Sequence, residues 1–149
     1  MHDRRTHRTL SDIALLRSAE RLAAYQALAD ARAREREAEE AASRADARAT
    51  AAAEDWSVHL AGSDFAPELA RALADDVVAQ GERAVLARNH CLRMADQREE
   101  SEQDWHDGDA RCRLADRALS DSRRARQRER DERLLALLAD RTALLWRRA

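Results

Sequence analysis

A seven-residue apolar repeat runs through the second half of this chain and constrains its fold more than any other feature. We call its positions the seam. At alternating spacings of four and three residues, they are Leu73, Val77, Gln80, Ala84, Ala87, Cys91, Met94, Arg98, Ser101, Trp105, Gly108, Cys112, Ala115 and Leu119. A repeat of this length is typical of a coiled-coil helix. Because a helix with one narrow apolar stripe is not stable alone in water, the seam requires a partner surface.

The seam is interrupted at four positions. Gln80, Arg98 and Ser101 are polar, and Gly108 lowers the helix propensity of its own stretch. Polar residues at seam positions cost stability but favour one pairing register over others. We therefore expect a weak coil with a defined register.

The composition leaves little material for a broad globular core. Hydrophobic residues make up 44% of the chain, but aromatic residues only 3%, and alanine is the commonest apolar residue. Alanine is the best helix former and contributes little core volume. With three glycines and one proline in 149 residues, the chain reads as long helices.

One turn signal divides the chain. Gly62 suits the end of a helix, and Pro67 suits the first turn of the next one. The sequence predicts a helix over 9–61, begun by capping oxygens of Thr9 and Ser11, a turn over 62–67 and a helix over 67–148, after a disordered basic tail over 1–8. The predicted fold is all-α: residues 9–149 form a single long antiparallel two-helix coiled-coil hairpin with an overhanging C-terminal helix.

The first helix supplies the partner stripe for the seam. Bulky residues come first and alanines follow: Leu10, Ile13, Leu15, Leu16, Leu22, Tyr25 and Leu28, then Ala31, Ala38, Ala42, Ala45, Ala49, Ala52, Trp56 and Leu60. If pairing starts at the turn, the numbers of facing residues sum to about 130. If residues 67–80 are instead a separate short helix with a kink at Gly81, the sum is about 140. The sequence leaves both geometries open.

The C-terminal stretch has a different character. Residues 120–149 carry nine arginines against five acids, while residues 61–119 carry eight against thirteen, so the chain is electrically polarised. A basic run, 123–130, is followed by leucines at 134, 135, 137, 138, 144 and 145 and by Trp146. These adjacent leucines cover a wider face than a seam. They either dock another protein or pack on Leu10 to Leu22.

Motifs for catalysis or ligand binding are lacking. The sequence has no glycine-rich phosphate loop, CxxC, HExxH or nucleophile elbow, and we expect neither an enzyme nor a cofactor. His106, Asp109 and Cys112 lie about one turn apart but make a weak metal signal without a fourth ligand. Cys91 and Cys112 are expected as free, packed thiols of a reducing compartment. Without a membrane-spanning run or signal peptide, a cytoplasmic protein is expected.

The layout resembles a known family. A first helix of aliphatics then alanines, a turn region from Trp56 to Leu73 and an arginine-rich second helix ending in leucines are similar to the FliJ/YscO-type stalk proteins of type III secretion, flagellar or injectisome. The resemblance implies that the open end of the hairpin enters the pore of a hexameric export ATPase. Other surfaces would contact the export gate and secretion chaperones.

The candidate partner-binding residues follow from this resemblance and from the wide apolar face of the C-terminal leucines. They are Leu10, Ile13, Leu16, Arg124, Arg128, Leu134, Leu138, Leu145 and Trp146. Two other functions stay open: a structural coiled-coil spacer or oligomerisation protein, and a nucleic-acid binder that uses Arg123 to Arg130. Against the latter, acids interrupt the arginines and the leucines do not continue through several heptads.

Overall fold

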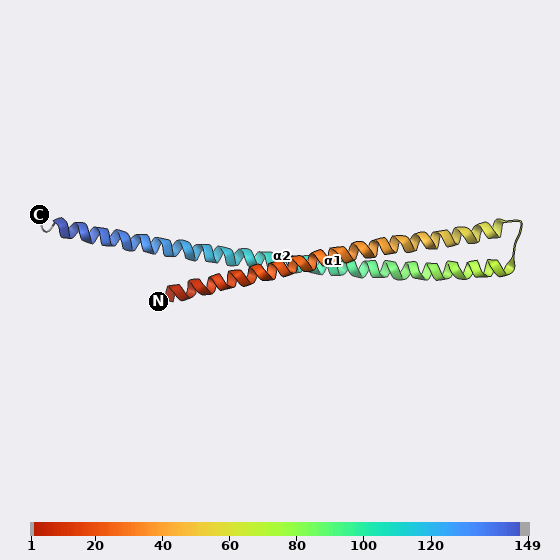
Figure 1. Cartoon of the computed structure of the whole chain (residues 1–149), viewed down its shortest axis with the longest axis horizontal. Coiled ribbons are helices and arrows are strands. Elements are labelled where there is room, and N and C mark those ends of the chain that lie inside the picture. Colours follow the sequence, from red (N-terminus) through yellow and green to blue (C-terminus); the bar gives the residue numbers. More distant parts are fainter. Residues whose placement is uncertain (1, 147–149) are drawn as a thin grey trace. The chain divides into compact units, whose positions relative to one another are not determined.

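The computed structural model describes residues 2–146, with side chains described for 5–143 and 146. It consists of two long helices, α1 (His2–Ala61) and α2 (Pro67–Trp146), joined by a short turn (Figure 1). No strand occurs within residues 2–146. This confirms the all-helical class expected from the alanine content and the seven-residue repeat.

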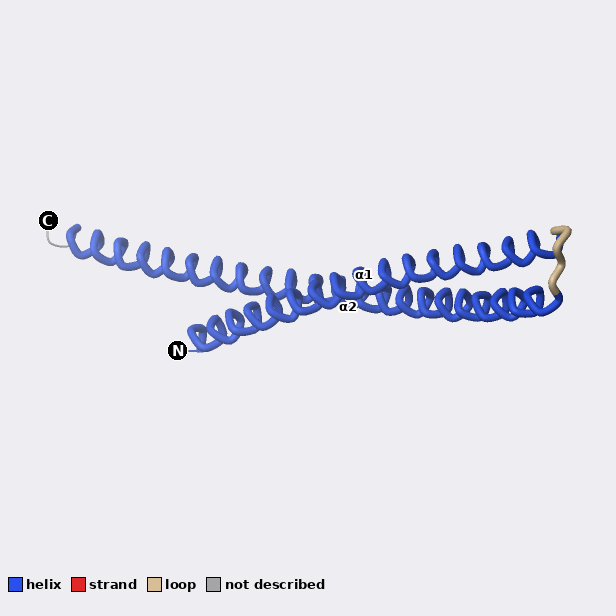
Figure 2. Tube along the Cα trace, turned by 45° about the vertical axis from the view of Figure 1, so that its right-hand side comes forward, coloured by secondary structure: helices blue, strands red, loops and turns tan. Residues whose placement is uncertain are grey.

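The turn lies where Gly62 and Pro67 predict it. The Gly62 N–H donates to the His59 carbonyl at 3.3 Å, and the Ala70 N–H donates to the Ala66 carbonyl at 2.9 Å. Proline suits the first position of α2 because its missing N–H has no intrahelical partner there. Gly62 does not adopt a positive φ, so the turn uses no left-handed residue. In Figures 1 and 2 the end of α1 and the start of α2 lie side by side next to this turn.

The start of α1 differs from the prediction. Residues 2–8, expected as a disordered tail, are helical, and α1 begins at His2 instead of Thr9. The Thr9 hydroxyl does not cap the helix but donates to the Arg5 carbonyl at 3.0 Å, a bond typical of a helix interior. The His7 ring contacts the Ser122 hydroxyl at 3.3 Å, which gives this segment a partner on α2.

Chain contacts divide the molecule into two compact units, Met1–Ala23 with His106–Ala149 (unit 1) and Ala24–Trp105 (unit 2). In unit 2, every seam position from Leu73 to Trp105 is buried or half-buried. On α1 the buried side chains are mostly alanines: Leu28, Ala31, Ala38, Ala42 and Ala52 are 2–8% exposed. Small side chains let the helix backbones approach closely, but they bury little apolar area.

Ion pairs across unit 2 support this burial. Arg88 reaches both carboxylate oxygens of Asp46, with Nε at 3.1 Å from one and a terminal nitrogen at 2.7 Å from the other. Arg32 lies 3.0 Å from Glu102, and Arg98 lies 3.2 Å from Glu35. Unit 2 therefore fits a helical hairpin around the turn.

Unit 1 has its own buried positions. Cys112, Ala14 and Leu119 are 1%, 6% and 9% exposed, and the seam positions Gly108 and Ala115 are half-buried. Arg21 on α1 lies 3.5 Å from Asp109 on α2. The larger residues Leu15, Leu16 and Leu22 are 57–68% exposed. Burial thus follows the seven-residue period and not side-chain size: Ala14 is buried, whereas Leu15, the next residue along the helix, is exposed.

The cross-helix contacts choose between the two registers left open by the sequence. The pairs His7–Ser122, Arg21–Asp109, Arg32–Glu102, Glu35–Arg98 and Asp46–Arg88 have residue numbers that sum to between 129 and 134. The sum of about 140 is therefore wrong. Consistently, α2 passes through Gly81 without interruption, so residues 67–80 are not a separate helix.

Candidate partner-binding surfaces

The C-terminal part of α2 carries most of the predicted partner-binding residues, and it is exposed. From Gln127 to Ala143 every side chain is exposed. Leu134 and Leu138 are 58% and 57% exposed, and Trp146 is 85% exposed. The side chain of Leu145 lies outside the described residues, as do Arg147 and Arg148, where the predicted second helix ends. Packing of the described leucines on Leu10 to Leu22 is therefore wrong for this structure.

The exposure of these leucines follows from their position relative to the seam spacing. Continued past Leu119, the four-three spacing reaches Ser122, Arg126, Glu129, Arg133, Ala136 and Asp140. Ser122 and Arg126 are still half-buried, but the positions after them are exposed. Leucines 134, 135, 137 and 138 fall between these positions. They cannot join a core that follows the seam.

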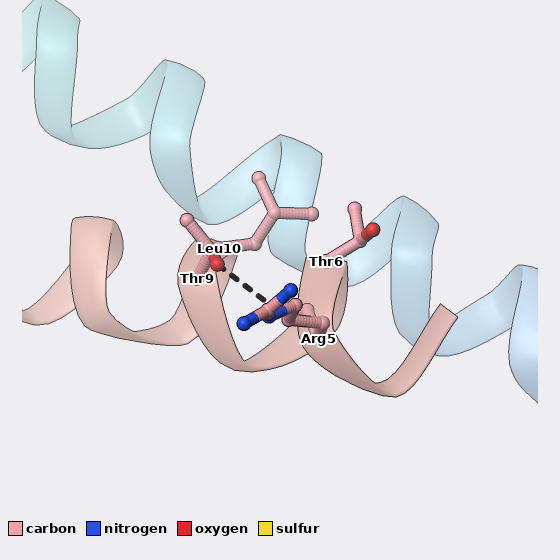
Figure 3. Close-up of a pocket in the computed structure, with 4 residues that line it drawn as sticks. All are labelled: Arg5, Thr6, Thr9 and Leu10. Atoms are coloured by element: carbon pink, nitrogen blue, oxygen red, sulfur yellow. Dashed lines mark hydrogen bonds between the residues drawn. The ribbon is translucent and has the colours of Figure 1, made fainter. Parts of the chain in front are cut away.

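The N-terminal candidates lie on α1 in the same compact unit. Leu10 is half-buried, whereas Ile13 and Leu16 are 40% and 57% exposed. Leu10 lines a shallow hollow of about 300 Å³ together with Arg5, Thr6 and Thr9 (Figure 3). The hollow is formed by one helix, so it is a surface feature and not an enclosed ligand site.

The basic run has an additional neighbour that the sequence did not indicate. His7 of α1 lines a second hollow of about 240 Å³ with Arg123, Arg126, Gln127 and Arg130 of α2. Arg124 and Arg128, the two predicted contact arginines, are exposed. Two acids reduce the net positive charge of this stretch. Glu129 pairs with Arg133, and Asp131 accepts a hydrogen bond from Gln127 at 2.9 Å. The predicted sum of about 130 for facing residues places residue 7 opposite residue 123, but the expectation of a disordered tail over 1–8 left His7 out of the predicted pairing.

The weak metal signal on α2 has another explanation in the structure. Asp109 pairs with Arg113 at 2.6 Å and with Arg21 at 3.5 Å, and the Cys112 thiol donates to Asp116 at 3.8 Å. Within the described part of the chain, no group of three His, Cys, Asp or Glu side chains is placed to hold a metal ion. Cys91 and Cys112 are both free thiols.

A cluster of charges in unit 2 surrounds the one seam arginine. Arg98 donates to Glu35 at 3.2 Å and to Glu102 at 2.8 Å, and Glu102 also accepts from Arg32 at 3.0 Å. The Arg98 hydrogen bond, reinforced by Arg32, holds the pKa of the Glu102 carboxyl below its ordinary value. The same bond and the charge of Glu35 raise the pKa of the Arg98 guanidinium. The cluster satisfies a charged residue at a seam position, which is a structural role.

The turn carries exposed apolar side chains. The His59 ring stacks on Phe65 at a centroid distance of 5.8 Å, and the Ala66 N–H donates to His59 Nε2 at 3.4 Å. Phe65, Leu60 and Leu69 are 53%, 46% and 49% exposed. The turn is therefore a second candidate contact surface. The sequence did not indicate it, because single apolar residues at a surface are common.

The fold and these surfaces define an all-α protein of two long helices whose arginine- and leucine-rich C-terminal part is exposed. None of the described helical stretches is long and apolar enough to cross a membrane. No protein-family model, curated protein or solved structure matches the chain.

Proposed function

We propose that this protein is the central stalk or escort of a type III secretion export ATPase, acting in the cytoplasm without catalysis of its own. The observation that carries the proposal is the exposed leucine face of α2, next to the basic run Arg123 to Arg130. Leu134, Leu135, Leu137 and Leu138 are 57–67% exposed, a large apolar area for residues so close together. A hexameric ATPase with a central pore is the partner that the family resemblance implies.

The proposal includes a finer architecture. We infer that α1 and α2 form an antiparallel coiled coil and that the end of α2 overhangs α1. The four-three burial pattern and the cross-helix ion pairs within each unit support the pairing. The exposure of every side chain from Gln127 to Ala143 supports the overhang.

Docking would proceed through two kinds of contact. Burying an exposed leucine or tryptophan contributes about 1.5–3 kcal/mol, so Leu134, Leu138, Leu145 and Trp146 would supply most of the affinity. Exposed arginines such as Arg124 and Arg128 would steer the encounter and raise the association rate at low salt. Leu10, Ile13 and Leu16 would complete the docking end, and other surfaces would serve the export gate and secretion chaperones.

The proposal is tested with the variant Leu138→Asp/Leu145→Asp. We expect unchanged helicity by circular dichroism, together with loss of binding to the cognate export ATPase and of its stimulation. A matched control is Leu86→Asp/Leu92→Asp, which alters two other leucines of α2 that are 67% and 64% exposed. If the first variant binds the ATPase as the parent does, the stalk proposal is wrong.

A structural spacer is the second candidate. The alanine-lined α1 stripe favours it, because such a stripe needs no partner beyond α2. This candidate gains if no export ATPase binds the protein.

Nucleic-acid binding is a remote third candidate: duplex DNA is expected to bind weakly and without sequence preference. Nanomolar binding at physiological salt that Arg124→Ala/Arg128→Ala removes would reverse this ranking.

A further inference from the structure

Three C-terminal leucines of α2, Leu134, Leu138 and Leu145, belong to a second stripe that is distinct from the seam. This stripe, called the C-terminal stripe below, comprises Gln127, Asp131, Leu134, Leu138, Arg141 and Leu145. It has the same four-three spacing as the seam. Each of its positions lies one or two residues after a seam position, so the stripe is turned by about 150° around the helix at about 100° per residue. All its described side chains are exposed.

The C-terminal stripe is symmetric about Ala136. Read backwards, Gln127 exchanges with Leu145, Asp131 with Arg141, and Leu134 with Leu138, so that each exchanged pair sums to 272. In an antiparallel coiled coil, a stripe position reached by a four-residue step on one helix faces a position reached by a three-residue step on the other helix. A stripe with this symmetry can therefore face a second copy of itself in every layer. The interface would be isologous, with one two-fold axis beside Ala136.

The charges on the stripe favour the antiparallel arrangement. Asp131 of one copy would face Arg141 of the other, and the two-fold axis repeats the pair. In a parallel arrangement, Asp131 would face Asp131, and Arg141 would face Arg141, which opposes association. Both residues are exposed, and Asp131 holds one short-range partner on its own helix, Gln127.

The residues that flank the stripe fit the same axis. Leu135 and Leu137, 66% and 67% exposed, lie one position to either side of Ala136. In the antiparallel pair each would meet its own copy near the axis. This explains why four leucines gather within five residues, which a single narrow stripe does not require. The charged residues Arg128, Arg130 and Glu132 flank the stripe away from its centre.

We propose that two copies of this protein associate through residues 127–145 of α2, in antiparallel orientation, about a two-fold axis beside Ala136. The occupant of the exposed leucine face is then a second copy of the chain. The inference does not depend on the proposed export ATPase. If both are correct, the dimer covers the face that the ATPase needs, and the two partners compete for it.

Charge reversal of the full-length protein tests the proposal, with the dimer dissociation constant measured by sedimentation equilibrium at low salt. Asp131→Arg would place two arginines together in each layer where Asp131 faces Arg141, and Arg141→Asp would place two acids together there. We expect each single variant to weaken the dimer by about ten-fold or more. The double variant Asp131→Arg/Arg141→Asp restores opposite charges and should return to within about three-fold of the parent. Asp140→Arg, one residue away and off the stripe, serves as the control and should leave the constant unchanged.

Cross-linking tests the orientation independently. With Cys91 and Cys112 replaced by alanine, Leu137→Cys should form a disulfide-linked dimer, because residue 137 meets its own copy beside the axis. Arg130→Cys, seven residues earlier on the same helix face, should not, because its copy lies about 18 Å away along the axis. Circular dichroism of each variant checks that the helices remain.

Three results would overturn the proposal. The first is a monomer at all accessible concentrations. The second is a dimer that the double charge reversal fails to restore, and the third is equal cross-linking at residues 130 and 137, as a parallel pair would give. Because these assays contain no ATPase, none of these results bears on the proposed stalk function. Loss of ATPase binding in the leucine variants likewise leaves the charge-reversal result in place.

Discussion

At the scale of single residues, Arg98 shows how a coil tolerates a charge in its seam. A partly buried guanidinium is costly unless carboxylates satisfy it. Here Glu35 on α1 and Glu102 on α2 both do so, at 3.2 Å and 2.8 Å. The arrangement depends on one alignment of the two helices, because a shift by one heptad would remove Glu35 from reach. Arg98 therefore favours the observed register within unit 2.

The Arg98 cluster predicts an acid-sensitive component of stability. The pKa of Glu102 is lowered in the folded protein, mainly by its hydrogen bond from Arg98. Its stabilising contribution is therefore complete above the ordinary carboxyl pKa of about 4.3 and is lost as the pH falls through the folded value. We expect the thermal midpoint to fall between about pH 5 and pH 3, and to fall less in Arg98→Met. Arg93→Met, at an exposed position, is the control, and an equal fall in both variants would contradict the assignment.

The two thiols are expected to differ in reactivity. Cys112 is 1% exposed, and its thiol donates to Asp116, whereas Cys91 is half-buried. A thiol reagent such as Ellman's reagent should modify Cys91 first in the native protein, because reaction requires access to the thiolate. Mass spectrometry of the singly modified protein identifies the site. Modification of Cys112 at the same rate would mean that unit 1 opens readily around it.

At the scale of the elements, α2 contains a glycine that its geometry does not require. Gly81 lies inside the helix without a positive φ, and a Cβ added there would meet no atom within 4 Å. Gly81→Ala should therefore stabilise the protein by about 0.5–1 kcal/mol, through the lower backbone entropy of alanine in the unfolded chain. Urea unfolding measures the gain. Gly62→Ala, outside the helices, should change stability little, and a loss in Gly81→Ala would reveal a contact at that position.

At the scale of the whole molecule, α1 and α2 have 60 and 80 residues, or 140 of the 149 in the chain, so circular dichroism should report an almost entirely helical protein.

A chain ending at Arg126 should keep the same free energy of unfolding within about 0.5 kcal/mol. The reason is that every described side chain from Gln127 to Ala143 is exposed. The comparison is made by urea unfolding at concentrations where the parent is a monomer. A larger loss of unfolding free energy would place the C-terminal leucines in the core. The shortened chain lacks the C-terminal stripe and should not dimerise at any concentration.

The sequence by itself determined the two helices, the turn between them and the buried face of α2. Each depends on neighbouring residues: the seven-residue period selects a face, and Gly62 and Pro67 mark a break. Every predicted seam position is buried or half-buried, including the polar ones. The tertiary structure alone decided the remaining features, because they depend on which residues of α1 and α2 face each other. It placed facing residues at sums of 129–134, extended α1 back to His2, and brought His7 to Ser122 and the basic run. It also left Leu134, Leu135, Leu137 and Leu138 exposed, because the positions that continue the seam spacing there are mostly polar and these leucines lie between them.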